Sequence, residues 1–276
     1  MSTKIGMSKK YKLGVIGNPI EHSLSPFIHS RFARNENINI DYQAYKVEEI
    51  NFSNFIKEFF SDNSAKGLNV TLPFKSLAAG LDGIISEEAS FINAVNTITL
   101  VDKKIRLAST DGEGFMNDLR SKNIDVVNKN ILILGAGAAV ESILFTLYNN
   151  NPKNISILNR TQDKAEKICL KYDDKRKVNT KILDGDYDLV INGSSAGLTG
   201  AFLPPKEIKI TNKTIFYDLN YSLGDTPFCE WAIENSNLVY DGIGMLAHQA
   251  ALSFDIWFGV CPNIDTVIDD LKSLKQ

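Results

Sequence analysis

Residues 130–150 read NILILGAGAAVESILFTLYNN, and this stretch decides the fold of the second half of the chain. Residues 131–134 are an apolar run of the kind that is buried on both faces of a parallel sheet. A glycine turn and a predicted helix follow this run. Further strands are predicted at 154–161, 186–195 and 214–221. This βαβαβ order predicts a doubly wound, Rossmann-like domain that binds a dinucleotide.

The glycine turn GAGAAV, residues 135–140, matches the dinucleotide-binding pattern G-x-G-x-x-G/A only in part. Gly135 would make the tight turn, and Gly137 would let the backbone approach a pyrophosphate, but Val140 stands at the third position. The strand before the turn and the helix after it favour a bound ligand over an empty strand–helix turn. We therefore predict that a pyrophosphate lies on the N–H groups at the start of the helix.

The end of the next strand distinguishes between nicotinamide cofactors. An NAD enzyme usually has a carboxylate there that accepts a hydrogen bond from the ribose 2′-OH. This chain has Asn159, Arg160 and Thr161 instead. Arg160 could bind a 2′-phosphate bidentately and Lys164 could add charge, although Arg160 could also be an ordinary surface residue and Thr161 a helix N-cap. The pattern favours NADP over NAD.

The first half of the chain is also α/β, but it has no phosphate-binding loop. Ser25 is predicted to be a helix N-cap with Pro26 at the first helical position, and residues 111–112 are the best candidate for a hinge. The predicted strands lie at 12–17, 41–47, 67–72 and 94–101, the predicted helices at 25–34 and 50–60, and two more helices within 242–276.

Several polar residues of this half could carry chemistry. Ser23 and Ser25 lie beside a helix N-terminus, which suits a carboxylate ligand. Lys75 follows the strand predicted to hold Thr71, and Asp111 lies at the predicted hinge. If Lys75 and Asp111 met, the lysine could pass a proton to an alkoxide near neutral pH. The residues alone leave the alternative of a surface lysine and a turn aspartate open.

The composition excludes several functional classes. The chain has 276 residues, 43 % of them hydrophobic, and a formal net charge of −3, so it lacks the basic excess expected of a nucleic-acid-binding protein. No segment reads as a signal peptide or a membrane span. Its three cysteines and three histidines are scattered, which predicts no metal, no disulfide framework and a cytoplasmic location.

Seven motifs occur together in one order, and the set resembles shikimate dehydrogenase, an NADP-dependent enzyme of aromatic amino-acid biosynthesis. The resemblance runs from about residue 12 to the C-terminal helices. It implies reduction of 3-dehydroshikimate to shikimate, with Lys75 and Asp111 as the catalytic pair. The motifs are GNPIEHSLSPFIH (17–29), NVTLPFK (69–75), AVNT (94–97), STDG (109–112), GAGAA (135–139), NRT (159–161) and GIGMLAHQA (242–250).

The resemblance also implies roles for individual residues. Ser23 and Ser25 would bind the substrate carboxylate near Tyr221, and Thr71, Asn96 and Gln249 would bind the ring hydroxyls. The residues implied to bind the cofactor are Gly135, Ala136, Gly137, Ala138, Ala139, Asn159, Arg160, Thr161, Lys164 and Gly242.

The implied domains are a discontinuous substrate-binding catalytic domain, residues 1–111 plus 243–276, and an NADP-binding domain, residues 112–242. The catalytic cleft would lie between them. The implied partner is a small molecule, shikimate or 3-dehydroshikimate, and the expected assembly is a monomer or a homodimer without nucleic acid or membrane.

The chain departs from the family pattern at several positions. Ser109 replaces an asparagine, which would loosen local hydrogen bonding, and Ala138 replaces a glycine. Glu141 stands where an arginine is common and would repel a diphosphate if it pointed inward. The alternatives are an enzyme that also oxidises quinate or prefers NAD, a non-catalytic dinucleotide sensor, and another two-domain NADP enzyme such as a methylenetetrahydrofolate dehydrogenase.

Overall fold

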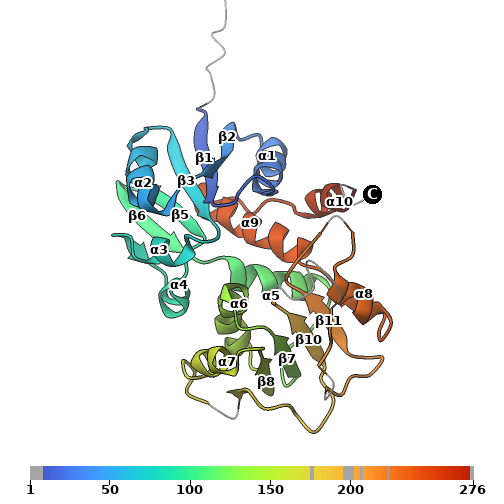
Figure 1. The fold of residues 1–276 in the computed structure, drawn as a ribbon. Helices are drawn as coiled ribbons and strands as arrows, with labels where there is room; N and C mark the ends of the chain where they lie inside the picture. Colours follow the sequence, from blue (N-terminus) through green and yellow to red (C-terminus); the bar gives the residue numbers. More distant parts are fainter. Residues whose placement is uncertain (1–8, 175–176, 195–201, 206–207, 223, 274–276) are drawn as a thin grey trace, which may run out of the picture. The chain divides into compact units, whose positions relative to one another are not determined.

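The computed structural model confirms the predicted α/β class, with a mixed sheet in one part of the chain and a Rossmann-like parallel sheet in the other (Figure 1). It describes residues 9–174, 177–194, 202–205, 208–222 and 224–273. The chain divides into two compact units, Met1–Thr110 with Gln249–Val267, and Asp111–His248 with Ile268–Gln276. The predicted boundaries of the substrate-binding and NADP-binding domains are defined by function and stay a prediction. No described helix is both long and apolar enough to cross a membrane.

The first unit is built on a mixed sheet. Its described strands are β1 (Tyr11–Gly17), β2 (Ile40–Lys46), β3 (Ala65–Val70), β4 (Ile84–Ile85), β5 (Thr97–Val101) and β6 (Lys104–Ala108). They lie in the order β2-β1-β3-β5-β6-β4. β1 is parallel to β2 and β3, whereas β5 is antiparallel to β3 and β6. The carboxyl ends of β1 and β3 therefore share one edge of the sheet with the start of β5.

Helices cover both faces of this sheet. Successive strand residues point to opposite faces, so each strand contributes side chains to the core on either side. Ile16 and Leu68 pack with Phe52 and Ile56 of α2 on one face, and Leu13 packs with Trp257 on the other. The helices are α1 (Ser25–Asn35), α2 (Phe52–Ser61), α3 (Lys75–Ala79) and α4 (Glu87–Ile92), with the 3-10 turn η1 (Glu49–Asn51). Residues 249–258 of α9 (Ile243–Phe258) and the start of α10 (Asp265–Ser273) also belong to this unit.

The core between α1 and α9 contains a buried histidine. The His29 ring is fully buried and stacks on Tyr42, with 4.5 Å between ring centroids. It also contacts the rings of Trp257 and Phe254. Neither ring nitrogen has a hydrogen-bond partner within the part of the chain that is described. Burial lowers the pKa of His29 from 6.5 to about 3, because the charged ring would lose its hydration.

His29 should make folding sensitive to acid. Its pKa is depressed in the folded state, so the unfolded chain binds a proton below pH 6.5 that the folded chain does not bind until about pH 3. The contribution of His29 to stability is thus fully present above pH 6.5 and is lost as the pH falls toward 3. Between pH 7 and pH 5 the loss is about 2 kcal/mol. For His29→Phe, the free energy of unfolding measured with urea should fall less between pH 7 and pH 5 than it does for the unmodified chain, and the difference should be about 2 kcal/mol.

The control for this prediction is His22→Gln, which changes an exposed histidine near the same helix. It should keep the pH dependence of the unmodified chain. A pH dependence in His29→Phe equal to that of the unmodified chain would show that His29 does not remain neutral in the folded protein.

The second unit contains the parallel sheet that residues 130–150 predict. Its described strands are β7 (Asn130–Leu134), β8 (Asn154–Leu158), β9 (Val178–Asn179), β10 (Leu189–Asn192), β11 (Ile215–Asp218) and β12 (Val239–Tyr240), in the order β12-β11-β10-β7-β8-β9. Its helices are α5 (Asp111–Ser121), α6 (Ala138–Asn149), α7 (Gln162–Cys169) and α8 (Pro227–Ile233), followed by residues 243–248 of α9. Residues of α5, α6 and α7 share one core with the sheet, and residues of α8 share the core on its other face.

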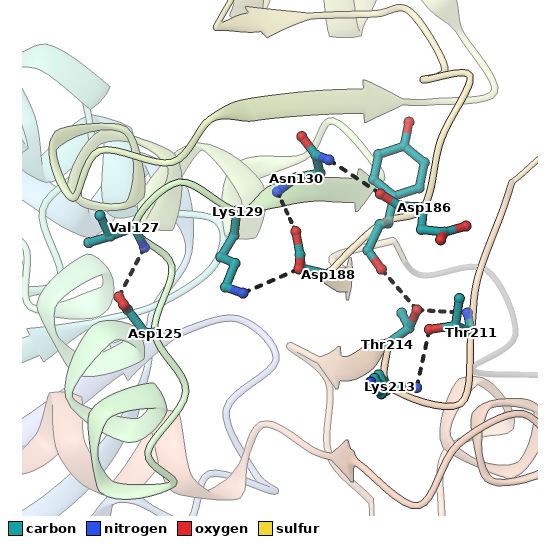
Figure 2. Close-up of polar contacts among 10 residues, drawn as sticks. Asp125, Val127, Lys129, Asn130, Asp186, Asp188, Thr211, Lys213 and Thr214 are labelled. Carbon is teal, nitrogen blue, oxygen red and sulfur yellow. Dashed lines mark hydrogen bonds and ion pairs between the residues drawn. The ribbon is translucent and has the colours of Figure 1, made fainter.

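The amino ends of three of these strands are held together by polar contacts (Figure 2). Asp188, just before β10, accepts hydrogen bonds from the backbone N–H of Asn130 at 2.8 Å and from Lys129 Nζ at 3.3 Å. Thr214, just before β11, donates to the carbonyl of Tyr187 at 2.8 Å. These contacts are structural, and they lie at the edge opposite the carboxyl ends of the strands, where ligands bind in such sheets.

Two local predictions were wrong. Ser25 is the first residue of α1 rather than its N-cap, a position that Leu24 occupies. The Ser23 hydroxyl accepts from the Ser25 N–H at 3.3 Å, so a serine does serve this helix start, but from an earlier position. The strand predicted over 67–72 ends at Val70, and Leu72 is 61 % exposed. Pro73 lacks an N–H group, so sheet pairing does not continue through this segment.

Candidate active site

The glycine turn of the second unit has the geometry that a pyrophosphate needs. Gly135 has a φ of +111°, and a Cβ there would lie 2.8 Å from the Ser194 nitrogen, so no other residue fits without strain. Gly137 is the N-cap of α6, and no side chain caps that helix start. A Cβ on Gly137 would meet nothing within 4 Å, and Ala138 and Ala139 are exposed. The turn thus leaves open space at a helix N-terminus, which suits a phosphate group.

Val140 is accommodated by a compensating glycine. The third position of the dinucleotide pattern is usually small because helix and strand pack closely there. Val140 is fully buried, and a Cβ at Gly193, just after β10, would lie 2.5 Å from its Cγ2. The space that the family pattern obtains on the helix is supplied here by the neighbouring strand, so the turn keeps its shape.

The end of β8 presents basic and polar side chains without a carboxylate. Asn159 Nδ2 donates to the Thr161 carbonyl at 2.8 Å, and Thr161 is the N-cap of α7, although its side chain makes no capping bond. Arg160 and Lys164 are exposed, as they must be to reach a cofactor phosphate. Gly242 is buried just before α9 and donates its N–H to the Asn220 carbonyl at 3.0 Å.

Glu141, in the first turn of α6, forms an ion pair with Lys171. Both side chains are partly exposed, so the pair contributes little to stability. Its consequence is electrostatic, because the carboxylate that stands where the family often has an arginine is neutralised by a lysine close to the glycine turn. The charge at this helix start is therefore less repulsive to a phosphate than the sequence indicates.

Asp218 is a residue of this edge that the sequence analysis missed. It ends β11, is buried, and accepts from Thr226 Oγ1 at 2.6 Å and Asn192 Nδ2 at 2.9 Å. It also accepts from the Asn220 backbone N–H at 3.0 Å. Burial raises its pKa, and these hydrogen bonds oppose that shift. Asp218 holds the carboxyl ends of β10 and β11 and the segment leading to Tyr221, whose side chain is 37 % exposed.

In the first unit, the segments that carry the predicted substrate residues meet at one sheet edge. Ser23 lies between β1 and α1, and Thr71 follows β3, the parallel neighbour of β1. The Asn18 N–H donates to the Leu72 carbonyl at 3.0 Å, which joins the two segments. Lys75 is the first residue of α3 and is half-buried. Residues with hydroxyl and ammonium side chains, distant in the sequence, therefore share this edge.

Two amides lie at the same edge. Asn96 precedes β5 and is 3 % exposed, and its carbonyl accepts from the Val70 N–H at 2.8 Å, at the end of β3. Asn96 Nδ2 donates to Gln249 Oε1 at 3.3 Å, which brings α9 to this edge. Ser25 is the first residue of α1 and is partly buried.

Two residues of the STDG motif, Asp111 and Ser109, are buried. Asp111 is the first residue of α5 and is buried, and it belongs to the second compact unit. Its pairing with Lys75 stays a prediction. Ser109, which replaces the family's asparagine, has a buried hydroxyl that finds no hydrogen-bond partner among the described residues.

The described residues contain no cluster of three or more His, Cys, Asp or Glu that could hold a metal.

Comparisons with known proteins match nearly the whole chain. The matching family models are described as the shikimate dehydrogenase substrate binding domain over residues 15–98, shikimate / quinate 5-dehydrogenase over 118–199, and the shikimate 5′-dehydrogenase C-terminal domain over 242–272. A protein of Colwellia psychrerythraea strain 34H named shikimate dehydrogenase (NADP(+)) is 41 % identical, over 95 % of this chain and 96 % of the relative.

Solved structures show the same fold. A crystal structure of an Ael1 enzyme from Pseudomonas putida has a TM-score of 0.87 and 35 % identity, over 95 % of this chain and 98 % of that chain. Shikimate 5-dehydrogenase from Thermus thermophilus, in complex with NADP(H) and shikimate, has a TM-score of 0.85 and 27 % identity, over 96 % of this chain and 99 % of that chain. Together, these matches confirm the resemblance that the seven motifs indicate.

Proposed function

The chain belongs to the shikimate dehydrogenase family, and on that premise we propose that it catalyses the reversible reduction of 3-dehydroshikimate to shikimate. It is an oxidoreductase, and its cofactor is NADP. The observation that carries the proposal is that the segments carrying these hydroxyl, amide and ammonium side chains meet at one sheet edge of the first unit. A hydroxylated ring acid offers complementary partners to each of these groups.

Lys75 is the proposed general acid and base. When bound, the nicotinamide of NADPH supplies a hydride to the ring ketone. Lys75 donates a proton to the forming alkoxide, and it takes the proton back when shikimate is oxidised. Asp111 is proposed to orient the ammonium group. We propose this pairing from the family resemblance.

Substrate recognition is proposed to divide between the two ends of the ring. Ser23 and Ser25 bind the carboxylate with the help of Tyr221, and Thr71, Asn96 and Gln249 bind the hydroxyls. The segments 17–25 and 71–75 are already joined by backbone hydrogen bonds, so this edge needs little ordering when substrate binds.

Replacing Ser23 with alanine should mainly raise the KM for shikimate. A hydrogen bond to a charged group is worth about 1.5–3 kcal/mol, so its loss should raise KM roughly 10- to 100-fold while kcat changes less. Steady-state kinetics with saturating NADP would measure both constants. Ser30→Ala, an exposed serine of α1, is the matched control and should leave both unchanged. An unchanged KM in Ser23→Ala would remove the carboxylate assignment.

The cofactor is proposed to lie on the second unit. Residues 135–139 would hold the pyrophosphate, Asn159, Arg160, Thr161 and Lys164 the 2′-phosphate end, and Gly242 would line the nicotinamide side. Residues 112–242 then form the NADP-binding domain, and residues 1–111 with 243–276 the substrate-binding domain. We also propose a cytoplasmic monomer or homodimer, consistent with Cys169, Cys229 and Cys261 being free thiols.

The alternative is an enzyme that accepts quinate and prefers NAD. The end of β8 argues against NAD, because the carboxylate that usually binds the ribose 2′-OH is absent and Arg160 is present. Rates with shikimate and quinate, each measured with NADP and with NAD, separate these possibilities.

A further inference from the structure

A chain of buried hydrogen bonds runs through the first unit to the two amides assigned to the substrate. Buried hydroxyls and amides are costly unless each group finds a partner, so a fully paired chain fixes the orientation of its members. All members except Gln249 are at least nine-tenths buried. In the order of their contacts they are Tyr42, Asn69, Ser253, Thr97, Asn96 and Gln249.

The first hydrogen bonds of this series, from Tyr42 to Ser253, determine how the Ser253 hydroxyl points. Tyr42 Oη donates to Asn69 Oδ1 at 2.8 Å, which turns the Asn69 NH₂ group toward α9. Asn69 Nδ2 then donates to Ser253 Oγ at 3.0 Å. Ser253 therefore accepts from Asn69, and its own proton is left for Thr97 Oγ1 at 2.7 Å, the Gln249 carbonyl at 3.1 Å or Thr110 Oγ1 at 3.3 Å.

The remaining hydrogen bonds of the series fix the side-chain amides of Asn96 and Gln249. Thr97 Oγ1 donates to Asn96 Oδ1 at 2.8 Å, and the Thr110 backbone N–H donates to the same oxygen at 2.9 Å. These two donors hold the Asn96 oxygen, and Asn96 Nδ2 donates to Thr110 Oγ1 at 2.9 Å and to Gln249 Oε1 at 3.3 Å. With its oxygen turned to Asn96, the Gln249 amide has its Nε2 group, a donor, on the other side.

We propose that Ser253 and Thr97 are positioning residues for the reaction. Their hydroxyls link α9 to β5 and, together with Thr110, set the donor and acceptor sides of Asn96 and Gln249. The inference rests on the proposed function, because that function assigns these two amides to the ring hydroxyls. Without the link, Asn96 is held through Thr110 alone, the contact between Asn96 and Gln249 loosens, and Gln249 presents its donor to the substrate in a smaller part of the population.

The test compares two substitutions that break the chain with two that do not. Thr97→Val and Ser253→Ala each remove a linking hydroxyl. Thr99→Val is the matched control, because Thr99 is as buried, lies two residues along on the same face of β5, and bonds only the Lys66 carbonyl among its described contacts. Thr97→Ser retains the hydroxyl and should restore wild-type behaviour. For each variant, steady-state kinetics give KM for shikimate and for NADP, and calorimetry gives the Kd of shikimate.

We expect Thr97→Val and Ser253→Ala to raise KM and Kd for shikimate about 5- to 10-fold while KM for NADP stays within twofold. A merely structural role would not separate the two substrates, and KM does not depend on how much of the sample is folded. If both variants match Thr99→Val in shikimate affinity, the positioning role is overturned while the proposed function stands. Failure of the unmodified chain to bind and oxidise shikimate would instead overturn the proposed function, and this inference with it.

Discussion

Replacing Lys75 with alanine is expected to lower kcat about 10²- to 10⁴-fold, the usual effect of losing a general acid–base group. The lysine begins α3 at the sheet edge where the candidate substrate residues gather, so the substitution removes an ammonium group without touching the sheet. The KM for shikimate should change much less, because carboxylate and hydroxyl recognition is assigned to other residues. Initial rates of NADPH formation at saturating shikimate and NADP would measure the loss.

The control for Lys75 is Lys57→Ala, which removes an exposed lysine from α2 of the same unit. It should keep wild-type kcat and KM. Asp111→Asn should lower kcat as well, and combining it with Lys75→Ala should lower kcat little further, because two residues that act as one unit do not add. If kcat of Lys75→Ala stays within about threefold of wild type, Lys75 is a binding or surface residue and the proposed chemistry needs another proton donor.

Replacing Arg160 with alanine is expected to raise the KM for NADP roughly 10- to 100-fold, because an arginine–phosphate hydrogen bond is worth about 1.5–3 kcal/mol. The KM for NAD, which lacks the 2′-phosphate, should change little. The preference for NADP would then fall by the same factor. Because the expected interaction is electrostatic and exposed, raising the salt concentration should reduce the difference between the two proteins.

Lys213→Ala is the matched control for Arg160, since Lys213 is another exposed cation of the second unit and lies just before β11, at the amino ends of the strands and so opposite the end of β8. It should leave both cofactor constants unchanged. Fluorescence titration of NADPH binding gives the same comparison without turnover. An equal rise of the NADP and NAD constants in Arg160→Ala would assign Arg160 to the shared part of the cofactor instead of the 2′-phosphate.

Sequence reasoning predicts best where local chemistry and packing agree. The apolar run of β7 and the glycine turn after it satisfy strand, turn and helix rules together, and the structure follows them. The helix α5 was missed because Gly112 and Gly114 disfavour a helix and residues 111–112 were interpreted as a hinge. In the structure both glycines are buried, and Phe115 and Leu119 of α5 pack into the core of the second unit. Tertiary packing thus overrides the local propensity.

The candidate site was predicted unevenly for a related reason. Motif order predicts which residues carry the chemistry, but the contact between Asn96 and Gln249 depends on how α9 packs on β5, which no local pattern specifies. The roles of Thr97 and Ser253 were invisible for the same reason, since a threonine in a strand and a serine in a helix are ordinary residues. The effect of the Glu141 charge could not be predicted from the sequence, because its ion-pair partner, Lys171, is 30 residues away.

The central claim is tested most directly by following absorbance at the nicotinamide band while the purified protein is mixed with shikimate and NADP. The account predicts rapid formation of NADPH, much slower reaction with NAD, and slower reaction with quinate than with shikimate. It also predicts that Lys75→Ala abolishes most of the signal. Binding of NADP with no reduction in the presence of shikimate would contradict the account and identify the chain as a dinucleotide-binding relative without this activity.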